Sequence, residues 1–227
     1  MKDYTKVLIA TPIRGNQTVT LYTAGLLQSN GLHGGWLPMA GQSDIYVARN
    51  VLANEFLMRK EFDTVVWIDS DIGFTRLDLQ KLIETDEAMV SGLYTDKCQP
   101  PQPFCRDENG IQLSLADIPK EGMLPARFVP GGFLKIDRIV FETLIAKGLA
   151  PTYGGGKFHH FYQGRIVLDN LLSEDYSFSD LVWSAGIQPW MNCGIRLNHD
   201  GRTCDPQPTV TPNNPTPDQL KAEAAVK

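Results

Sequence analysis

The chain has 227 residues, of which 42% are hydrophobic and 21% are charged, and its formal net charge at pH 7 is −5. This length allows one domain with a well-filled core, and the proportions are ordinary for a water-soluble globular protein. The acidic balance argues against a generally basic nucleic-acid-binding protein, although it leaves room for a local basic groove.

The cysteines and the N-terminus indicate the compartment. Cys98, Cys105, Cys193 and Cys204 form no Cys-x-x-Cys pair, which disfavours both a zinc site and a secreted disulfide scaffold. The N-terminus has no apolar signal segment. No run approaches the roughly 18 apolar residues that a membrane span needs. We therefore expect a cytoplasmic protein with reduced thiols and no membrane span.

The first half of the chain alternates between predicted strands and helices. The expected elements are a strand at 7–10, a helix at 17–29 capped by Asn16 and closed by Gly31, a strand at 36–39, a helix at 45–59 opened by Ser43-Asp44, a strand at 64–68, a helix at 77–85 and a strand at 89–94. The strand at 64–68 is a continuous β-branched and aromatic run, which is typical of a central parallel strand. This alternation predicts an α/β domain with a mostly parallel sheet.

The second half is less regular. The expected elements are a long loop at 98–125, a strand at 128–136 interrupted by Gly131-Gly132, a helix at 137–148, a glycine-rich mobile flap at 151–169, a helix at 173–186, a short strand toward Trp190 and a polar loop through His199. Large apolar residues almost disappear after Pro206. We therefore predict one domain at 1–205 and a disordered tail at 206–227.

Two aspartates follow the predicted central strand, in the motif Asp69-Ser70-Asp71. Ligands of open α/β sheets bind beyond the carboxyl ends of the strands, and carboxylates are suitable ligands for Mg²⁺ or Mn²⁺. One carboxylate can hold a metal while the other reaches a ribose or a metal-bound water. The motif also suits a polar turn, but its position directly after an apolar strand favours a metal and diphosphate site.

Three further residues have both structural and functional interpretations. Arg49 lies at the edge of the apolar stripe of its helix, where a guanidinium needs a partner such as Asp69 or a phosphate, or else extends to solvent beside a structural ion pair. Asp175 falls in the first turn of a helix, where acids complement the dipole. His199 lies among residues that suit a turn.

Several motifs together resemble those of GT-A fold glycosyltransferases, most closely the large inverting family 2 and its small bacterial and phage-encoded relatives. In chain order the motifs are Thr11-Pro12-Ile13-Arg14-Gly15, Ser43-Asp44-Ile45 with Arg49-Asn50, Asp69-Ser70-Asp71, Pro130-Gly131-Gly132-Phe133, Ser173-Glu174-Asp175 and Asn198-His199. The resemblance covers about residues 5 to 201 by motif order rather than by close identity. It implies a GT-A fold and transfer of a sugar from a nucleotide diphosphate sugar of the UDP or GDP type.

The resemblance also implies roles for single residues. The nucleotide-sugar would lie against Thr11, Pro12, Arg14, Arg49 and Asp69, with Gly131 and Gly132 allowing close approach of the backbone. Mn²⁺ or Mg²⁺ would be held by Asp69, Asp71 and His199. Asp175 would be the base that deprotonates the acceptor hydroxyl, which gives an inverting reaction.

Three other classes are compatible with parts of the pattern. A phosphohydrolase prefers a Gly-Thr turn after its second aspartate, and here Ile72-Gly73-Phe74 follows. A nucleotidyltransferase making nucleotide sugars needs a basic glycine-rich loop after its first strand, which residues 11–15 match poorly. A non-catalytic nucleotide-sugar-binding module would have lost acids that this chain retains. The acceptor stays open among a glycan, a lipid, a protein and a modified DNA base.

Overall fold

The computed structural model describes residues 2–13, 17–96, 101–167, 170–200 and 202–203. Three sequence-based expectations lie outside these residues: the role of Arg14, the helix cap at Asn16 and the tail at 206–227. Within the described part of the chain, no helix combines the length and the apolar composition that crossing a bilayer requires.

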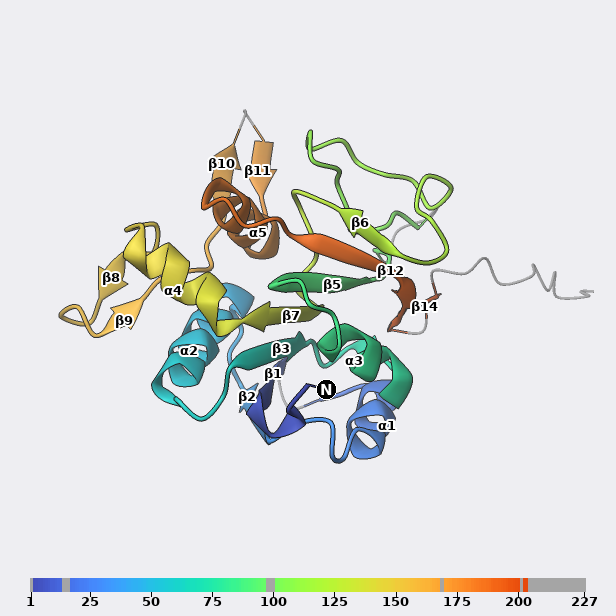
Figure 1. Cartoon of the computed structure of the whole chain (residues 1–227), viewed down its shortest axis with the longest axis horizontal. Coiled ribbons are helices and arrows are strands. Elements are labelled where there is room, and N and C mark those ends of the chain that lie inside the picture. Colours follow the sequence, from blue (N-terminus) through green and yellow to red (C-terminus); the bar gives the residue numbers. More distant parts are fainter. Residues whose placement is uncertain (1, 14–16, 97–100, 168–169, 201, 204–227) are drawn as a thin grey trace, which may run out of the picture.

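A seven-stranded sheet runs through the middle of the molecule (Figure 1), in the order β2-β1-β3-β7-β5-β12-β6. Its strands, in that order, are Gly35–Ala40, Val7–Ile13, Thr64–Ile68, Phe133–Asp137, Met89–Leu93, Trp190–Arg196 and Met123–Pro125. β1 pairs in parallel with β2 and β3, and β12 with β5. β7 is antiparallel to β3 and β5, and β6 is antiparallel to β12. Five strands therefore share one direction, which confirms the mostly parallel sheet.

The central strand β3 differs from the expectation in one respect, because only one of its two neighbours is parallel. β1 pairs with it in parallel, whereas β7 pairs with it in the opposite direction. A parallel return needs a crossover connection, usually a helix. The described residues between β5 and β7 contain no helix, so the chain re-enters the sheet antiparallel.

Two groups of helices flank the sheet (Figure 1). The helices are α1 (Thr20–Gln28), α2 (Ile45–Met58), α3 (Arg76–Ile83), α4 (Arg138–Ala146) and α5 (Glu174–Ser184). α1 contacts α3, whereas α2, α4 and α5 meet through the rings of Phe56, Phe141 and Phe178. α1 begins at Thr20 rather than at residue 17, because the Val19 amide donates to the Ser70 carbonyl and keeps the preceding chain extended.

The segment expected to be a mobile flap is in part anchored in the core. It forms one hairpin from β8 (Thr152–Tyr153) and β9 (Phe158–His159), and another from β10 (Arg165–Val167) and β11 (Asn170–Leu172). Between the hairpins Phe161 and Tyr162 are buried. The Asn50 carboxamide accepts from both of their amides at 2.7 and 3.0 Å and donates to the Tyr162 carbonyl at 2.7 Å. The flap interpretation is therefore wrong for these residues.

Lys135 gives the fold a measurable pH dependence. It is fully buried in β7 and donates to the carbonyls of Thr85 and Glu87, each at 2.7 Å. Burial lowers the pKa of Lys135 to about 8, although Asp137 at 3.6 Å opposes the shift. The unfolded chain keeps this proton up to a pKa of 10.5, so between those values the unfolded state binds more protons and stability rises with pH.

We therefore expect wild type to gain stability over Lys135→Met as the pH is raised from 7.5 to 10. The gain should be about 2 kcal/mol, since each pKa unit is worth about 1.4 kcal/mol. Urea denaturation of both proteins across this pH range measures the difference. Parallel pH profiles would show that Lys135 is an ordinary lysine.

Candidate functional site

The two aspartates lie where the sequence predicts them, just beyond the carboxyl end of β3. The Asp69 amide donates to the Gly132 carbonyl at 2.9 Å, and its carbonyl accepts from the Ile72 amide at 3.0 Å. A tight turn therefore follows β3 and leads directly into β4 (Ile72–Gly73). This turn places Asp69 and Asp71 at the sheet edge at which ligands of open α/β folds bind.

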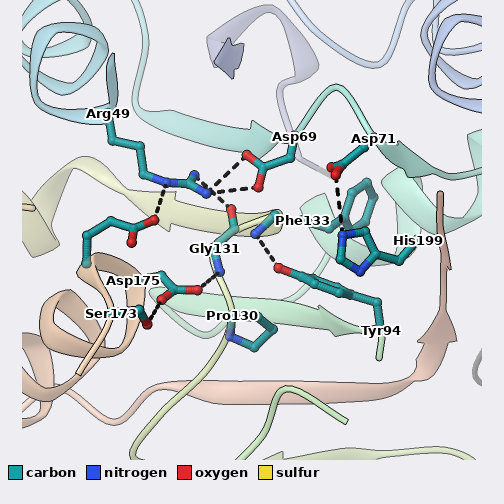
Figure 2. Close-up of polar contacts among 12 residues, drawn as sticks. Arg49, Asp69, Asp71, Tyr94, Pro130, Gly131, Phe133, Ser173, Asp175 and His199 are labelled. Atoms are coloured by element: carbon teal, nitrogen blue, oxygen red, sulfur yellow. Dashed lines mark hydrogen bonds and ion pairs between the residues drawn. The ribbon is translucent and has the colours of Figure 1, made fainter. Parts of the chain in front are cut away.

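Arg49 is the centre of a buried ionic cluster (Figure 2). Its side chain, 2% exposed, donates one Nη to both carboxylate oxygens of Asp69 at 3.0 Å and the other to the Gly131 carbonyl at 3.0 Å. Its Nε lies 3.6 Å from the Glu174 carboxylate. Of the two interpretations of Arg49, the pairing with Asp69 is therefore the one found. Glu174 was not among the predicted site residues, although its place beside Asp175 in an acidic pair was a usable signal.

Three acids, Asp69, Glu174 and Asp175, act electrostatically on the Arg49 guanidinium. Burial raises the pKa of the Asp69 carboxyl, and Arg49 opposes that shift while Asp71 and Asp175 add to it. Burial likewise raises the pKa of Glu174, with Asp175 as the next cause. The site is therefore rich in negative charge, and it favours a further cation nearby.

The glycine loop before β7 is enclosed by the protein's own side chains. The Gly131 amide donates to an Asp175 carboxylate oxygen at 3.2 Å, and the Gly132 amide donates to the Tyr94 hydroxyl at 2.8 Å. A Cβ on residue 131 would lie 3.1 Å from Arg49 Cζ, and one on residue 132 would lie 2.6 Å from Tyr94 Oη. A side chain at residue 132 would therefore force Tyr94 to move, whereas residue 131 is tightly packed. The approach of a donor to this loop stays a prediction.

Tyr94 is a site residue that the sequence did not reveal. It is buried just after β5, its hydroxyl accepts from Gly132, and its ring packs edge-on against His199 with centroids 5.2 Å apart (Figure 2). Burial is the main cause that raises its pKa well above the ordinary value. The phenol therefore stays neutral and connects the glycine loop to the histidine.

Asp175 lies in the first turn of α5, as predicted, and its role as a base stays a prediction. One carboxylate oxygen accepts a hydrogen bond from the Ser173 hydroxyl. The same oxygen accepts another from the Tyr176 amide, at 2.8 Å, in the first turn of α5. The other oxygen accepts from Gly131 across the site. The helix therefore brings this carboxylate to the Arg49 cluster, and α5 begins at the site rather than away from it.

His199 reaches the site through a strand pairing. The residues expected to form a polar loop instead form β13 (Asn198–His199), which pairs antiparallel with β4 so that His199 lies opposite Ile72. His199 Nε2 then lies 3.4 Å from an Asp71 carboxylate oxygen, and Nδ1 lies 2.7 Å from the Thr95 carbonyl. A carbonyl can only accept, so Nδ1 carries the proton and Nε2 faces Asp71.

The predicted metal ligands are divided by this arrangement. Asp71 and His199 face each other, whereas the Asp69 carboxylate is turned to Arg49. Within the described ranges no group of three or more histidine, cysteine, aspartate or glutamate side chains is placed to hold an ion. Two of the three predicted ligands therefore lie together at this point, and their binding of a metal stays a prediction.

A cavity of about 560 Å³ opens in front of the aspartates. Its described lining comes from the end of β1, the chain before α1, the chain before α2 and the DxD turn: Pro12, Ile13, Gln17, Thr18, Val19, Gln42, Ser43, Ile45, Ala48, Asp69, Ser70, Asp71 and Asp200. Three of these described lining residues are aspartates, so a cation would favour the binding of an anionic ligand beside them.

Pro12 and Thr11, both predicted to line a nucleotide pocket, differ in their position relative to the cavity. Pro12 lines the cavity, as expected. Thr11 does not, because it is fully buried and its hydroxyl accepts from Trp36 Nε1 at 3.1 Å and shares a hydrogen bond with the Tyr22 hydroxyl at 2.8 Å. The pocket role of Thr11 is therefore corrected to a structural one.

The strand order, with a single antiparallel strand inserted at the site, and the acids at the sheet edge define the class as an α/β protein of the GT-A type. Among solved structures the chain is similar to A197 from STIV, with a TM-score of 0.56 and 17% sequence identity over 84% of this chain and 84% of that chain. At this identity the similarity confirms the fold alone.

The chain is also similar to GalNAc-T7, solved with UDP, GalNAc and Mn²⁺, with a TM-score of 0.46 and 12% identity over 85% of this chain and 43% of that chain. That score is too low to bear on the fold or the function. No protein-family model matches the sequence. No curated protein matches it either.

Proposed function

We propose that the protein is a metal-dependent glycosyltransferase that moves a sugar from a nucleotide diphosphate sugar to an acceptor hydroxyl. One observation carries the proposal: Asp71 lines a cavity of about 560 Å³ beyond the carboxyl end of β3, and His199 faces Asp71. The fold is a suitable scaffold for this reaction, but the assignment depends on the site.

The residues present suit a divalent cation. Hydrogen bonding of Nδ1 to Thr95 points Nε2 of His199 at the Asp71 carboxylate, and an outer hydrogen bond of this kind is usual for a metal-binding histidine. Mg²⁺ and its relatives bind through few protein ligands together with substrate phosphates. Bound here, the ion would neutralise charge on the leaving diphosphate.

The cavity supports a donor held by its nucleotide end. Gln17, Gln42 and Ser43 offer neutral hydrogen-bonding groups in its lining, which suit a base and a ribose. Asp69 also lines this space; its main-chain amide is bound to the Gly132 carbonyl, and its carboxylate is held by Arg49. A donor's diphosphate would then lie toward Asp71, and its sugar toward the glycine loop.

Asp175 is proposed as the base that takes the proton of the acceptor hydroxyl. It lies across Gly131 from the Arg49 cluster, and Ser173 and the start of α5 orient it. Direct displacement by a deprotonated hydroxyl gives an inverting reaction with no covalent sugar-enzyme intermediate.

Asp175→Asn should lower kcat by about 10²-fold, the usual worth of general-base catalysis, while leaving donor affinity largely unchanged. Asparagine keeps the size of the side chain and can still accept from Gly131. The control is Asp117→Asn, because Asp117 is exposed. Asp180→Asn is unsuitable as a control, because Asp180 is buried and forms an ion pair with Arg127. A near-normal rate for Asp175→Asn, or a product that retains the donor's anomeric configuration, would remove Asp175 from this role.

A thermal-shift screen tests the proposal as a whole. UDP-, GDP- and dTDP-sugars are compared with and without Mn²⁺, because a ligand that binds the native state raises the midpoint. At least one donor should raise it only when the metal is present. A screen in which no donor stabilises the protein, or in which chelation changes nothing, would refute the proposal.

A further inference from the structure

A second cavity, of about 450 Å³, lies at the other end of α2. Its walls come from the C-terminal half of α2, from α4 and from β9. Ala48 lines the first cavity and Met58 lines the second. These residues are ten positions apart on one helix, or about 15 Å at the usual helical rise. The second cavity, which we call the basic cleft, is therefore separate from the candidate active site.

The described lining of the basic cleft combines apolar and polar side chains. Leu57 and Met58 of α2, Ile145 of α4 and Phe158 of β9 all contribute to it. Met58 is 56% exposed, and Leu57 and Phe158 are only partly buried. Ligand sites typically combine an apolar lining of this kind with a few polar groups that orient the ligand.

The charged groups of the cleft are mostly cationic. Lys60, from the chain after α2, and Lys157, from the chain before β9, both line it together with His159, and Glu142 is the one acid among the described lining residues. Within the described part of the chain, neither lysine forms an ion pair with a carboxylate. Two unpaired lysines facing one cleft are a local exception in a chain with a net charge of −5. This charge is complementary to an anion.

The end of α2 does not oppose an anion here. The last carbonyls of a helix carry partial negative charge. In this protein the Arg138 guanidinium covers them, donating to the carbonyls of Phe56 at 3.0 Å, Leu57 at 3.3 Å and Arg59 at 2.8 Å. The positive charge of Arg138 therefore offsets the partial negative charge at the end of α2. The two lysines then contribute most of the charge of the cleft.

The wall formed by β9 is held in place by Asn54. The Asn54 carboxamide accepts from the His159 amide and donates to the His159 carbonyl, each at 2.8 Å. The main-chain N–H and C=O of His159 are thus both hydrogen-bonded to a side chain of α2, in the way that a neighbouring β-strand would bind them. A wall fixed in this way lowers the ordering cost of binding.

We propose that the basic cleft binds a small organic anion with an aromatic ring or similar apolar body, its charge between Lys60 and Lys157 and its apolar part against Leu57, Ile145 and Phe158. The residues that carry this inference do not line the first cavity, so it does not depend on the proposed function.

Fluorescence titration with 8-anilinonaphthalene-1-sulfonate, an aromatic anion, tests the proposal on the full chain. The uncharged N-phenyl-1-naphthylamine serves as the matched neutral probe. We expect saturable binding of the anion, at least tenfold tighter than that of the neutral probe. Lys60→Ala and Lys157→Ala should each weaken anion binding by about fivefold, roughly what one near-surface charge contributes, and leave binding of the neutral probe unchanged.

Lys120→Ala, on an exposed residue outside the cleft lining, is the control and should bind the anion as wild type does. Ile145→Asp places a carboxylate in the apolar lining and should abolish anion binding, provided that the thermal midpoint shows a folded protein. Equal binding of both probes, or lysine variants that bind the anion like wild type, would overturn the proposal.

Discussion

Asp71→Asn should lower kcat/KM for glycosyl transfer by about 10³-fold and abolish the dependence of donor binding on Mn²⁺. Asparagine keeps the shape of the side chain but removes the negative charge that faces His199 Nε2 at 3.4 Å. A metal ion at a diphosphate contributes several kcal/mol to transition-state stabilisation, and this site has few protein ligands to compensate. Steady-state rates and donor affinities at several Mn²⁺ concentrations measure both effects.

Asp86→Asn provides the control for that experiment, since Asp86 is exposed in the turn between α3 and β5. It should behave as wild type at every Mn²⁺ concentration. If Asp71→Asn is stimulated by Mn²⁺ to the same degree as wild type, the metal does not bind where we propose.

Arg49→Met should destabilise the protein by about 3–5 kcal/mol, which is the usual effect of removing one partner of a buried ion pair. For a chain of this length the thermal midpoint should fall by about 10 °C or more. The physical reason is that Asp69 and Glu174 lose their shared cation while the Gly131 carbonyl loses a donor. Arg59→Met, at the end of the same helix, is the control and should have a small effect.

The pH dependence of this loss identifies its cause. The pKa values of Asp69 and Glu174 are raised by burial in the folded protein, and without Arg49 they should rise further. A raised carboxyl pKa gives stability that is present at low pH and is lost as the pH rises through the folded-state value. The deficit of Arg49→Met should therefore be smaller at pH 5 than at pH 8. A deficit independent of pH would assign it to packing alone.

Arg49→Lys separates charge from geometry. Lysine keeps the cation, but it cannot bind both Asp69 oxygens and the Gly131 carbonyl in the planar arrangement of a guanidinium. We expect it to recover part of the stability of Arg49→Met.

The sequence alone could predict the features that depend on local pattern. The run Thr64–Ile68 consists of β-branched and aromatic residues, so its burial and the position of Asp69 and Asp71 after it follow from strand geometry. Arg49 beside an apolar stripe needed a buried partner, and Asp69 was named as one choice. These predictions succeed because each rests on neighbouring residues or on one strong physical requirement.

Other features depend on contacts between distant segments. His199 lies beside Asp71 only because β13 pairs with β4, and no local pattern specifies that pairing. Tyr94 reads in the sequence as one more core aromatic, and its hydrogen bond to Gly132 depends on β7 returning beside β5. Thr11 was expected in the pocket, but Trp36 and Tyr22 draw its hydroxyl inward. Side-chain direction of this kind is decided by tertiary partners.

The central claim is that Asp71 and His199 hold a metal ion together with a nucleotide donor. Pulsed electron paramagnetic resonance of Mn²⁺ added with UDP or GDP tests it most directly, because it detects coupling to a coordinated imidazole nitrogen. We predict this nitrogen signal in the wild-type protein and its loss in His199→Gln, with Mn²⁺ affinity also reduced in Asp71→Asn. A nitrogen signal that persists in His199→Gln, or Mn²⁺ that fails to bind with either nucleotide, would contradict the account.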